Sequence, residues 1–316
     1  MRFSAILQFL ATCLLLALGL SAQGDDPFDQ PPIEYSTRTP NDCVSQLQGR
    51  LESGEQQLEF QDKLGYLPAV LRALNVPIES QMLVFSQTSL QRQRISPRRP
   101  RAIYFSDEVY IGFCQLGNVL EVAAVDPQLG AVFYTIEQEQ AEKPRFVRQT
   151  ESCLVCHSST RTDGVPGLLV RSLFVDQSGQ PVLSEGSHMV DHRTPLEQRW
   201  GGWYVTGTHG AQVHMGNLVL PDRKAPRPIE NKEGQNVTDL SGRFRVANYL
   251  SPHSDIVALM VLEHQALVQN RIIQAGFVTR QALHYEAEMN RAFAEPEGNR
   301  LESTTRRIQS AGDALV

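Results

Sequence analysis

Apolar and polar residues alternate with a period of two along the middle of the chain, which is the pattern of half-buried β-strands. The alternating segments span residues 82–86, 102–105, 109–113, 119–125 and 131–136. Between the last two lies Asp126-Pro127-Gln128-Leu129-Gly130, whose Asp, Pro and Gly favour a tight turn and predict a hairpin. A second hairpin is predicted from residues 168–175 and 181–183, which flank Asp176-Gln177-Ser178-Gly179.

The period changes to three and four residues near both ends of the chain, where we expect helices. Asp42 is suited to begin a helix that reaches Glu52, and a second helical segment covers residues 67–74. Near the other end, Ser254 or Asp255 precedes apolar residues at helical spacing, and Gly276 predicts the stop of that helix. Two more helices are predicted over residues 279–292 and 300–311. The whole pattern predicts an α+β fold, with a strand-rich central region containing hairpins and flanked by N-terminal and C-terminal helices.

The remaining segments divide the chain by composition. Residues 1–22 have the parts of a secretory signal peptide, which are a basic start at Arg2, an apolar stretch and small residues ending at Ala22. We expect cleavage near Ala22 and a periplasmic or secreted protein without a stable transmembrane anchor. A retained anchor is the alternative, although the apolar stretch is short of the ~20 residues that span a membrane. The rest comprises a flexible lead-in, a mixed α/β region, an exposed loop and a C-terminal helical region, at residues 23–40, 41–220, 221–237 and 238–316.

Composition narrows the class of partner. The 316 residues include 29 Lys and Arg against 35 Asp and Glu, so the formal net charge is −6. Nucleic-acid binding depends on basic side chains that neutralise phosphates, so nucleic acid is not an expected partner. With 41% hydrophobic residues, the chain is long enough for a sizeable core.

The most specific chemistry lies in one short run, Cys153-Leu154-Val155-Cys156-His157. Two cysteines three positions apart, followed by a histidine, form the Cys-x-x-Cys-His pattern of covalent haem attachment, and the pattern occurs once. On these residues the chain resembles the c-type cytochromes, and its layout resembles long, secreted, single-haem bacterial proteins. The resemblance does not extend to the compact all-helical cytochrome c fold, because strand-like segments lie on both sides of the motif.

The resemblance implies a site and a function. Cys153 and Cys156 are expected to form thioethers to one haem c per chain, and His157 to bind the iron as proximal ligand. Haem of this type is attached outside the cytoplasm, in agreement with the signal peptide. The implied function is electron transfer in the cell envelope, with a redox partner protein or a small electron donor or acceptor. The alternative is a haem enzyme or small-ligand sensor with an open sixth coordination position, since the sixth ligand decides between these functions.

Candidates for that sixth ligand lie downstream of the motif, and no histidine precedes His157. The leading candidates are His214, Met215, His188, Met189 and His192, and His264 is a weaker one. A methionine would raise the reduction potential relative to a second histidine. For each residue the alternative is an ordinary surface histidine or a core methionine.

Other residues near the motif in sequence suit contacts with a porphyrin. The segment 162–167 has the Asp, Gly and Pro residues of tight turns. The segment 199–204 holds both tryptophans, which are suited to exclude water from the haem edge; the alternative is that they belong to an ordinary strand core. Arg161, Arg171 and Arg193 are candidates to pair with haem propionates, with solvated arginine as the alternative.

Two rival interpretations of the motif use the same cysteines. A zinc site requires a fourth ligand and an awkward pair of neighbouring ligands, Cys156 and His157. A thioredoxin-like dithiol requires a strand-to-helix context that the sequence does not indicate. Cys13 leaves with the signal peptide, so Cys43 and Cys114 remain, either as a disulfide or as two buried thiols.

Overall fold

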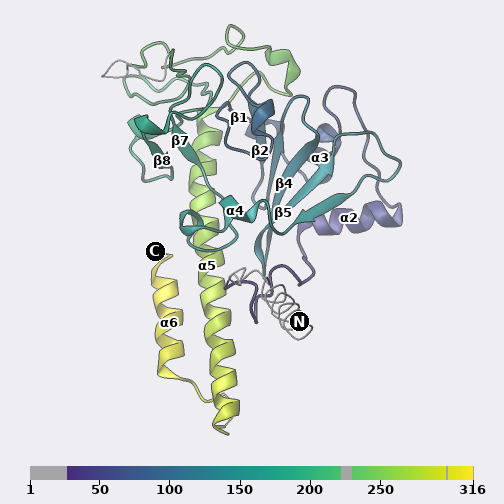
Figure 1. The fold of residues 1–316 in the computed structure, drawn as a ribbon, viewed down its shortest axis with the longest axis vertical. Coiled ribbons are helices and arrows are strands. Elements are labelled where there is room, and N and C mark those ends of the chain that lie inside the picture. The colour runs from purple at the N-terminus through teal and green to yellow at the C-terminus, as the bar shows by residue number, and fades with distance from the viewer. Residues whose placement is uncertain (1–26, 222–229, 297, 316) are drawn as a thin grey trace, which may run out of the picture.

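The structure is a computed structural model that describes residues 27–221, 230–296 and 298–315. The predicted signal peptide at 1–22 lies outside these residues, as do residues 222–229 of the predicted loop at 221–237. Figure 1 shows strands in the centre, helices α2 and α3 on one side, and the long helix α5 on the other. The α-helices are α2 (Cys43–Ser53), α3 (Leu67–Ala73), α4 (Leu154–His157), α5 (Ile256–Ala292) and α6 (Glu302–Asp313). The predicted α+β class, with strands flanked by N-terminal and C-terminal helices, is confirmed.

A six-stranded antiparallel sheet forms the centre, and its strands are paired in chain order. They are β1 (Met82–Val84), β2 (Arg101–Phe105), β3 (Val109–Phe113), β4 (Val119–Asp126), β5 (Gly130–Glu137) and β6 (Phe146–Gln149). The predicted hairpin is β4–β5, and its turn is held by Asp126, whose carboxylate accepts the backbone N–H groups of Gln128 and Leu129. Sequence alternation predicted five of these strands and missed β6, where only Phe146 is buried.

The two faces of the sheet pack against different parts of the chain. On one face, the Tyr134 hydroxyl donates to the Asp42 carboxylate at 2.6 Å, and Asp42 caps α2 as predicted. On the other face, Tyr110, Ala123 and Phe133 are cross-strand neighbours. This second face receives α5, since the Tyr110 hydroxyl lies 2.7 Å from the Gln269 side-chain oxygen, and it also receives the Cys-x-x-Cys-His motif.

Helix α5 runs without interruption for 37 residues, so the predicted stop at Gly276 is wrong. Ile273 and Phe277 on either side of the glycine are buried in the same core as the sheet. A glycine in a helix costs only ~1 kcal/mol relative to alanine, and such burial exceeds this cost. The helix predicted to stop at Gly276 and the helix predicted over 279–292 are therefore one element. Helix α6 lies close to its predicted range of 300–311.

Two further expectations need correction. Residues 27–40 of the predicted flexible lead-in are packed, because Phe28, Ile33 and Tyr35 are buried and the Tyr35 hydroxyl donates to the Ala131 carbonyl at 2.8 Å. The predicted partner strand at 181–183 is reduced to one bridge at Pro181, a residue that lacks the N–H group of a strand ladder. Strand β7 (Arg171–Leu173) pairs instead with β8 (Ser187–Met189).

Candidate functional site

The motif forms a single helical turn, α4, which Figure 1 shows between α5 and the sheet. The turn closes because the N–H of His157 donates to the Cys153 carbonyl at 3.0 Å. Leu154 is buried and anchors the turn, Cys153 is half-buried against the core, and Cys156 is exposed. Both predicted thiols and the histidine are therefore on one turn, with one thiol toward the core and the other toward solvent.

The imidazole of His157 is oriented by a carbonyl group. Its Nδ1 lies 2.9 Å from the carbonyl oxygen of Gly167, and because a carbonyl only accepts, Nδ1 carries the proton. Nε2 then keeps its lone pair, and no hydrogen bond to it is found among the described residues. The ring lies 4.8 Å from that of Phe133 on β5, and burial lowers the pKa of His157. A neutral imidazole with a fixed tautomer is the form that binds a metal.

The turn that supplies the carbonyl is itself fixed by α5. The Asn270 side chain accepts from Leu168 N–H at 2.8 Å and donates to the Leu168 carbonyl at 2.6 Å. A Cβ on Gly167 would lie 2.4 Å from Asn270 Oδ1, so this close approach requires glycine. The buried Thr162 hydroxyl donates to the Val165 carbonyl at 2.8 Å. The predicted turn at 162–167 thus positions His157, and the link to Asn270 had no signal in the sequence.

A charged pair lies on the sheet face toward the motif. Arg101 on β2 and Glu121 on β4 form an ion pair at 2.6 Å, with side chains 18% and 15% exposed. Burial raises the pKa of the Cys153 thiol, and the Glu121 charge raises it further, while both charges of the pair act on His157. Sequence reasoning missed this pair. Its only signal was a charged residue at position 121 within an alternating, apolar strand.

The candidate ligand His214 lies in a separate, buried cluster. Its Nδ1 accepts the Gly216 N–H at 3.0 Å, and its ring lies 4.7 Å from His209 and 5.1 Å from Trp200. Burial lowers the pKa of His214 to about 4, so the ring is neutral. The sulfur of Met215 accepts from the Ser172 hydroxyl at 3.8 Å. One ring nitrogen of His214 and the sulfur of Met215 are therefore hydrogen-bonded within the protein.

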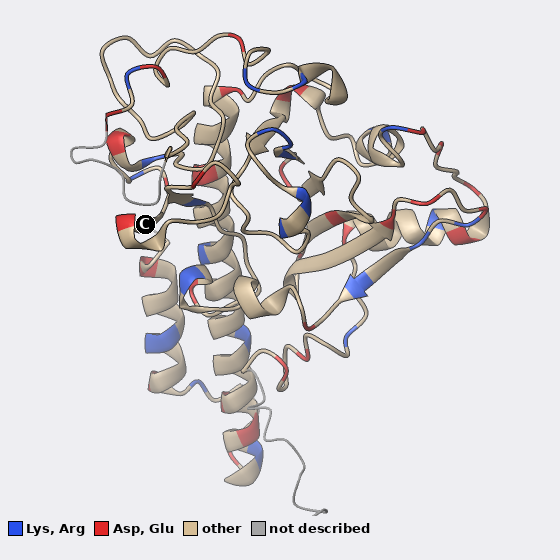
Figure 2. Ribbon diagram, turned by 45° about the horizontal axis from the view of Figure 1, so that its top comes forward, with Lys and Arg blue, Asp and Glu red and all other residues tan. Residues whose placement is uncertain are grey.

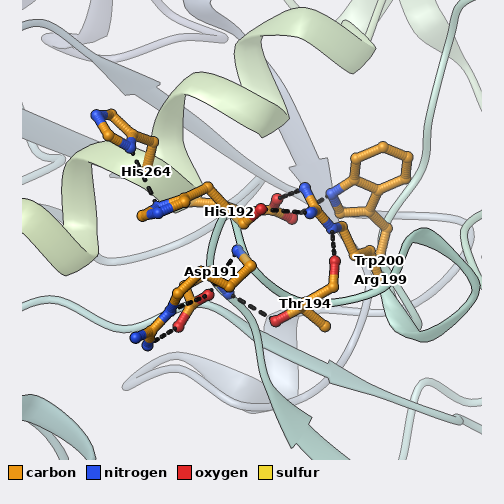
Figure 3. A network of polar contacts seen from close by, with 8 residues as sticks. Asp191, His192, Thr194, Arg199, Trp200 and His264 are labelled. Atoms are coloured by element: carbon orange, nitrogen blue, oxygen red, sulfur yellow. Dashed lines mark hydrogen bonds and ion pairs between the residues drawn. The ribbon is translucent and has the colours of Figure 1, made fainter.

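His192 and His264 meet at the surface, with their Nδ1 atoms 3.1 Å apart (Figure 3). Beside them, the wholly buried Glu263 accepts from Arg199 at 2.8 Å and from Trp200 at 2.5 Å. Burial raises the pKa of Glu263 to about 7, and Arg199 opposes this. The predicted aromatic segment 199–204 is thus tied to α5 through a buried carboxylate.

The last two candidates, His188 and Met189, are exposed on β8, and their side chains have no hydrogen bond among the described residues. Met189 lies opposite Arg171 in the ladder. Burial lowers the pKa of the Arg171 guanidinium, and the charge of Cys156 opposes this, so β7 lies within electrostatic range of the motif. Neither side chain is therefore held by a hydrogen bond, and the strand that pairs with theirs carries an arginine on which the charge of Cys156 acts.

The three arginines proposed for propionates differ in their partners. Arg193 forms an ion pair with Asp191 at 2.7 Å, and Arg171 donates to the Ser187 hydroxyl at 2.8 Å. Arg161 is exposed. Burial lowers the pKa of Arg171, and the like charge of Arg161 lowers it further. Arg161 and Arg171 therefore place positive charge beside the motif, whereas Arg193 is already neutralised.

The remaining cysteines, Cys43 and Cys114, are free thiols, and burial raises their pKa values to about 11 and about 12. Within the described ranges, no three or more His, Cys, Asp or Glu side chains gather as a metal site, and no helix is long and apolar enough to cross a membrane. Comparisons of the chain with protein-family models, with curated proteins and with solved structures found no match.

Proposed function

We propose that this protein is a single-haem c-type cytochrome of the cell envelope, periplasmic or secreted, whose function is electron transfer. The observation that carries the proposal is the His157–Gly167 hydrogen bond at 2.9 Å. This bond leaves Nε2 unprotonated and without a hydrogen-bond partner among the described residues. His157 lies on the same turn as two thiols, of which one is exposed. This donor set fits haem c, for which Cys153 and Cys156 provide thioethers and His157 the proximal ligand.

The residues around the motif support the same function. When bound, haem supplies an iron that changes between ferrous and ferric states by one electron. Gly167 and Asn270 hold the imidazole orientation, and Phe133 excludes water from one side of it. The Arg101–Glu121 pair places fixed charges near the thioether positions, and such charges influence a reduction potential. These residues orient the imidazole, exclude water and supply fixed charge. None of them has to move during electron transfer.

The test is the visible spectrum of protein made with the c-type maturation machinery, oxidised and then reduced with dithionite. We expect haem bands that survive acid–acetone extraction in the wild type. His157→Ala is expected to retain covalent haem but to shift the Soret and α bands, because the thioethers remain and the proximal ligand is lost. His253→Ala, at an exposed histidine of a loop, is the matched control and is expected to leave the spectrum unchanged. An unaltered spectrum in His157→Ala contradicts the assignment.

A haem enzyme or sensor is the second candidate function. It is favoured by one observation, which is that the side chains of His192, His214 and Met215 are each hydrogen-bonded within the protein. Carbon monoxide added to the reduced protein separates the functions. Indifference to carbon monoxide indicates a strong sixth ligand and electron transfer, whereas a marked Soret shift indicates an open position.

A further inference from the structure

Five arginines and no acidic residue occupy the ten positions from Arg92 to Arg101, in a chain whose net charge is −6. Elsewhere, Figure 2 shows Lys and Arg positions interspersed with Asp and Glu positions, including along α5 and α6. The segment 92–101 is therefore a local reversal of the overall charge. We name it the basic segment.

Among the residues that the structure describes, the one ion pair of the basic segment joins Arg101 to Glu121 at 2.6 Å. The other four arginines are exposed, and within the described part of the chain none of them has a carboxylate partner. They are Arg92, Arg94, Arg98 and Arg99. Arg94 makes a weak contact at 3.4 Å with the Asn118 side-chain oxygen, which carries no charge. Their positive charge is thus available to an external anion.

Two of these arginines line a cavity at the molecular surface. Its walls are residues 89–94 together with Asn118 and Val119 at the start of β4. Gln91 fixes the wall, since its side chain donates to the Val119 carbonyl at 3.0 Å and accepts from Asn118 N–H at 2.8 Å. Leu90 in the same wall is 54% exposed. An apolar side chain among arginines is a composition that suits protein–protein contact.

The cavity is linked to the haem-attachment motif through Glu121. Gln91 donates to one oxygen of this carboxylate at 3.2 Å, and Arg101 donates to the other. Glu121 and Arg101 act electrostatically on both Cys153 and His157. One carboxylate therefore connects the cavity wall with the sheet face that lies toward the motif.

We propose that the cavity between the basic segment and β4 is the docking surface for the acidic face of an electron-transfer protein. This inference rests on the proposed function, because it names the chemistry of the redox partner. The exchange is one electron without bond changes: the ferrous protein becomes ferric as a one-electron acceptor in the partner is reduced, or the reverse. Local positive charge attracts such a partner against the repulsion of the chain's net negative charge.

Anion docking is tested first, with a readout that does not depend on haem. Paramagnetic hexacyanochromate(III) is titrated into isotope-labelled, full-length mature protein, and broadening of backbone amide signals is recorded. We expect broadening centred on residues 91–94 and 118, and none there with the cationic hexaamminechromium(III). The broadening is expected to disappear in Arg92→Glu/Arg94→Glu and to persist in Arg306→Glu/Arg307→Glu, which makes the same charge change on exposed residues of α6. Broadening spread evenly over the surface overturns the proposal.

The electron route is tested by stopped-flow oxidation of the reduced protein. Ferricyanide takes one electron from the protein and becomes ferrocyanide, and tris(phenanthroline)cobalt(III) serves as the cationic oxidant. At low ionic strength we expect the ferricyanide rate constant to fall by about 10-fold or more in Arg92→Glu/Arg94→Glu, and the cobalt rate constant to rise. Added salt is expected to slow ferricyanide oxidation of the wild type, because it screens an attraction.

The outcomes separate this inference from the proposed function. Absence of covalent haem refutes the proposed function, and the amide broadening still reports whether anions dock. Covalent haem with equal ferricyanide rates in the wild type and both double variants refutes the docking surface alone. Sedimentation with vesicles of anionic phospholipid that is lost in Arg92→Glu/Arg94→Glu assigns the basic segment to a membrane surface and also overturns the proposal.

Discussion

Glu263 is a wholly buried carboxylate on α5, and each of its oxygens accepts one hydrogen bond, from Arg199 or from Trp200. Burial opposes ionisation more strongly than the arginine favours it, so the pKa rises to about 7. At the scale of the residue, a solvent-free environment therefore decides the protonation of Glu263. Nothing in the sequence around this helical position indicates that its carboxylate is buried.

The raised pKa has a consequence for stability that Glu263→Gln tests. The folded protein binds this proton more tightly than the unfolded chain, whose pKa is near 4.5, so the free energy of unfolding falls as pH rises from about 4.5 to about 7. Glutamine cannot ionise. We expect the variant to gain about 3 kcal/mol relative to the wild type between pH 5 and pH 8, measured by urea unfolding.

Glu288→Gln, on an exposed part of the same helix, is the control and is expected to follow the wild type at both pH values. A constant difference between Glu263→Gln and the wild type contradicts the prediction. It would mean that the Arg199 guanidinium keeps the carboxylate ionised throughout this range.

At the scale of the element, α5 contacts the sheet, the turn after the motif and the segment that contains Arg199. It begins at Asp255, whose side chain accepts two backbone N–H groups, and it continues through Gly276. Along its length it orients Gly167 through Asn270 and carries Glu263. The helix therefore joins the turn that positions His157 to the cluster around Trp200.

Gly276 offers a test of this element. The nearest atom to a Cβ at this position is 3.3 Å away, at the flexible end of Arg280. We expect Gly276→Ala to stabilise the protein by about 0.5–1 kcal/mol, because alanine lowers the entropy of the unfolded chain, and thermal unfolding measures this. The matched control is Gly130→Ala, with φ +75° and a Cβ only 2.6 Å from Ile273, which is expected to destabilise. A lower melting temperature for Gly276→Ala contradicts the prediction.

At the scale of the whole molecule, the four cysteines of the described residues fall into two classes. Cys153 and Cys156 lie on one turn beside the sheet, and Cys43 and Cys114 are separate, free thiols with raised pKa values. Raised pKa values suppress the thiolate form that reacts with disulfide reagents. If Cys153 and Cys156 form thioethers to haem, Cys43 and Cys114 are the two thiols that remain among the described residues.

Titration of the mature holoprotein with a thiol-reactive disulfide reagent counts that set. We expect no fast-reacting thiol in the native protein, because Cys43 and Cys114 are shielded and the other two form thioethers. After denaturation we expect two thiols per chain. Four thiols would exclude thioether attachment, and none would show that Cys43 and Cys114 form a disulfide under oxidising conditions.

Local patterns in the sequence were sufficient for the α+β class, for five of the six sheet strands, for the cap at Asp42 and for the motif itself. Each depends on residues close together in the chain, because period, turn chemistry and thiol spacing are local properties. The same reasoning failed at Gly276 and at residues 27–40, where burial against distant residues outweighs local preference.

Only the tertiary structure decided which distant residues meet. Asn270 lies 103 positions from Gly167, and Glu121 lies 32 positions from Cys153, yet one fixes the carbonyl that orients His157 and the other adds charge at the motif. The sequence by itself determined the chemistry of the thiols and the imidazole. Their orientation, protonation and charged surroundings depend on long-range packing, which no local pattern encodes.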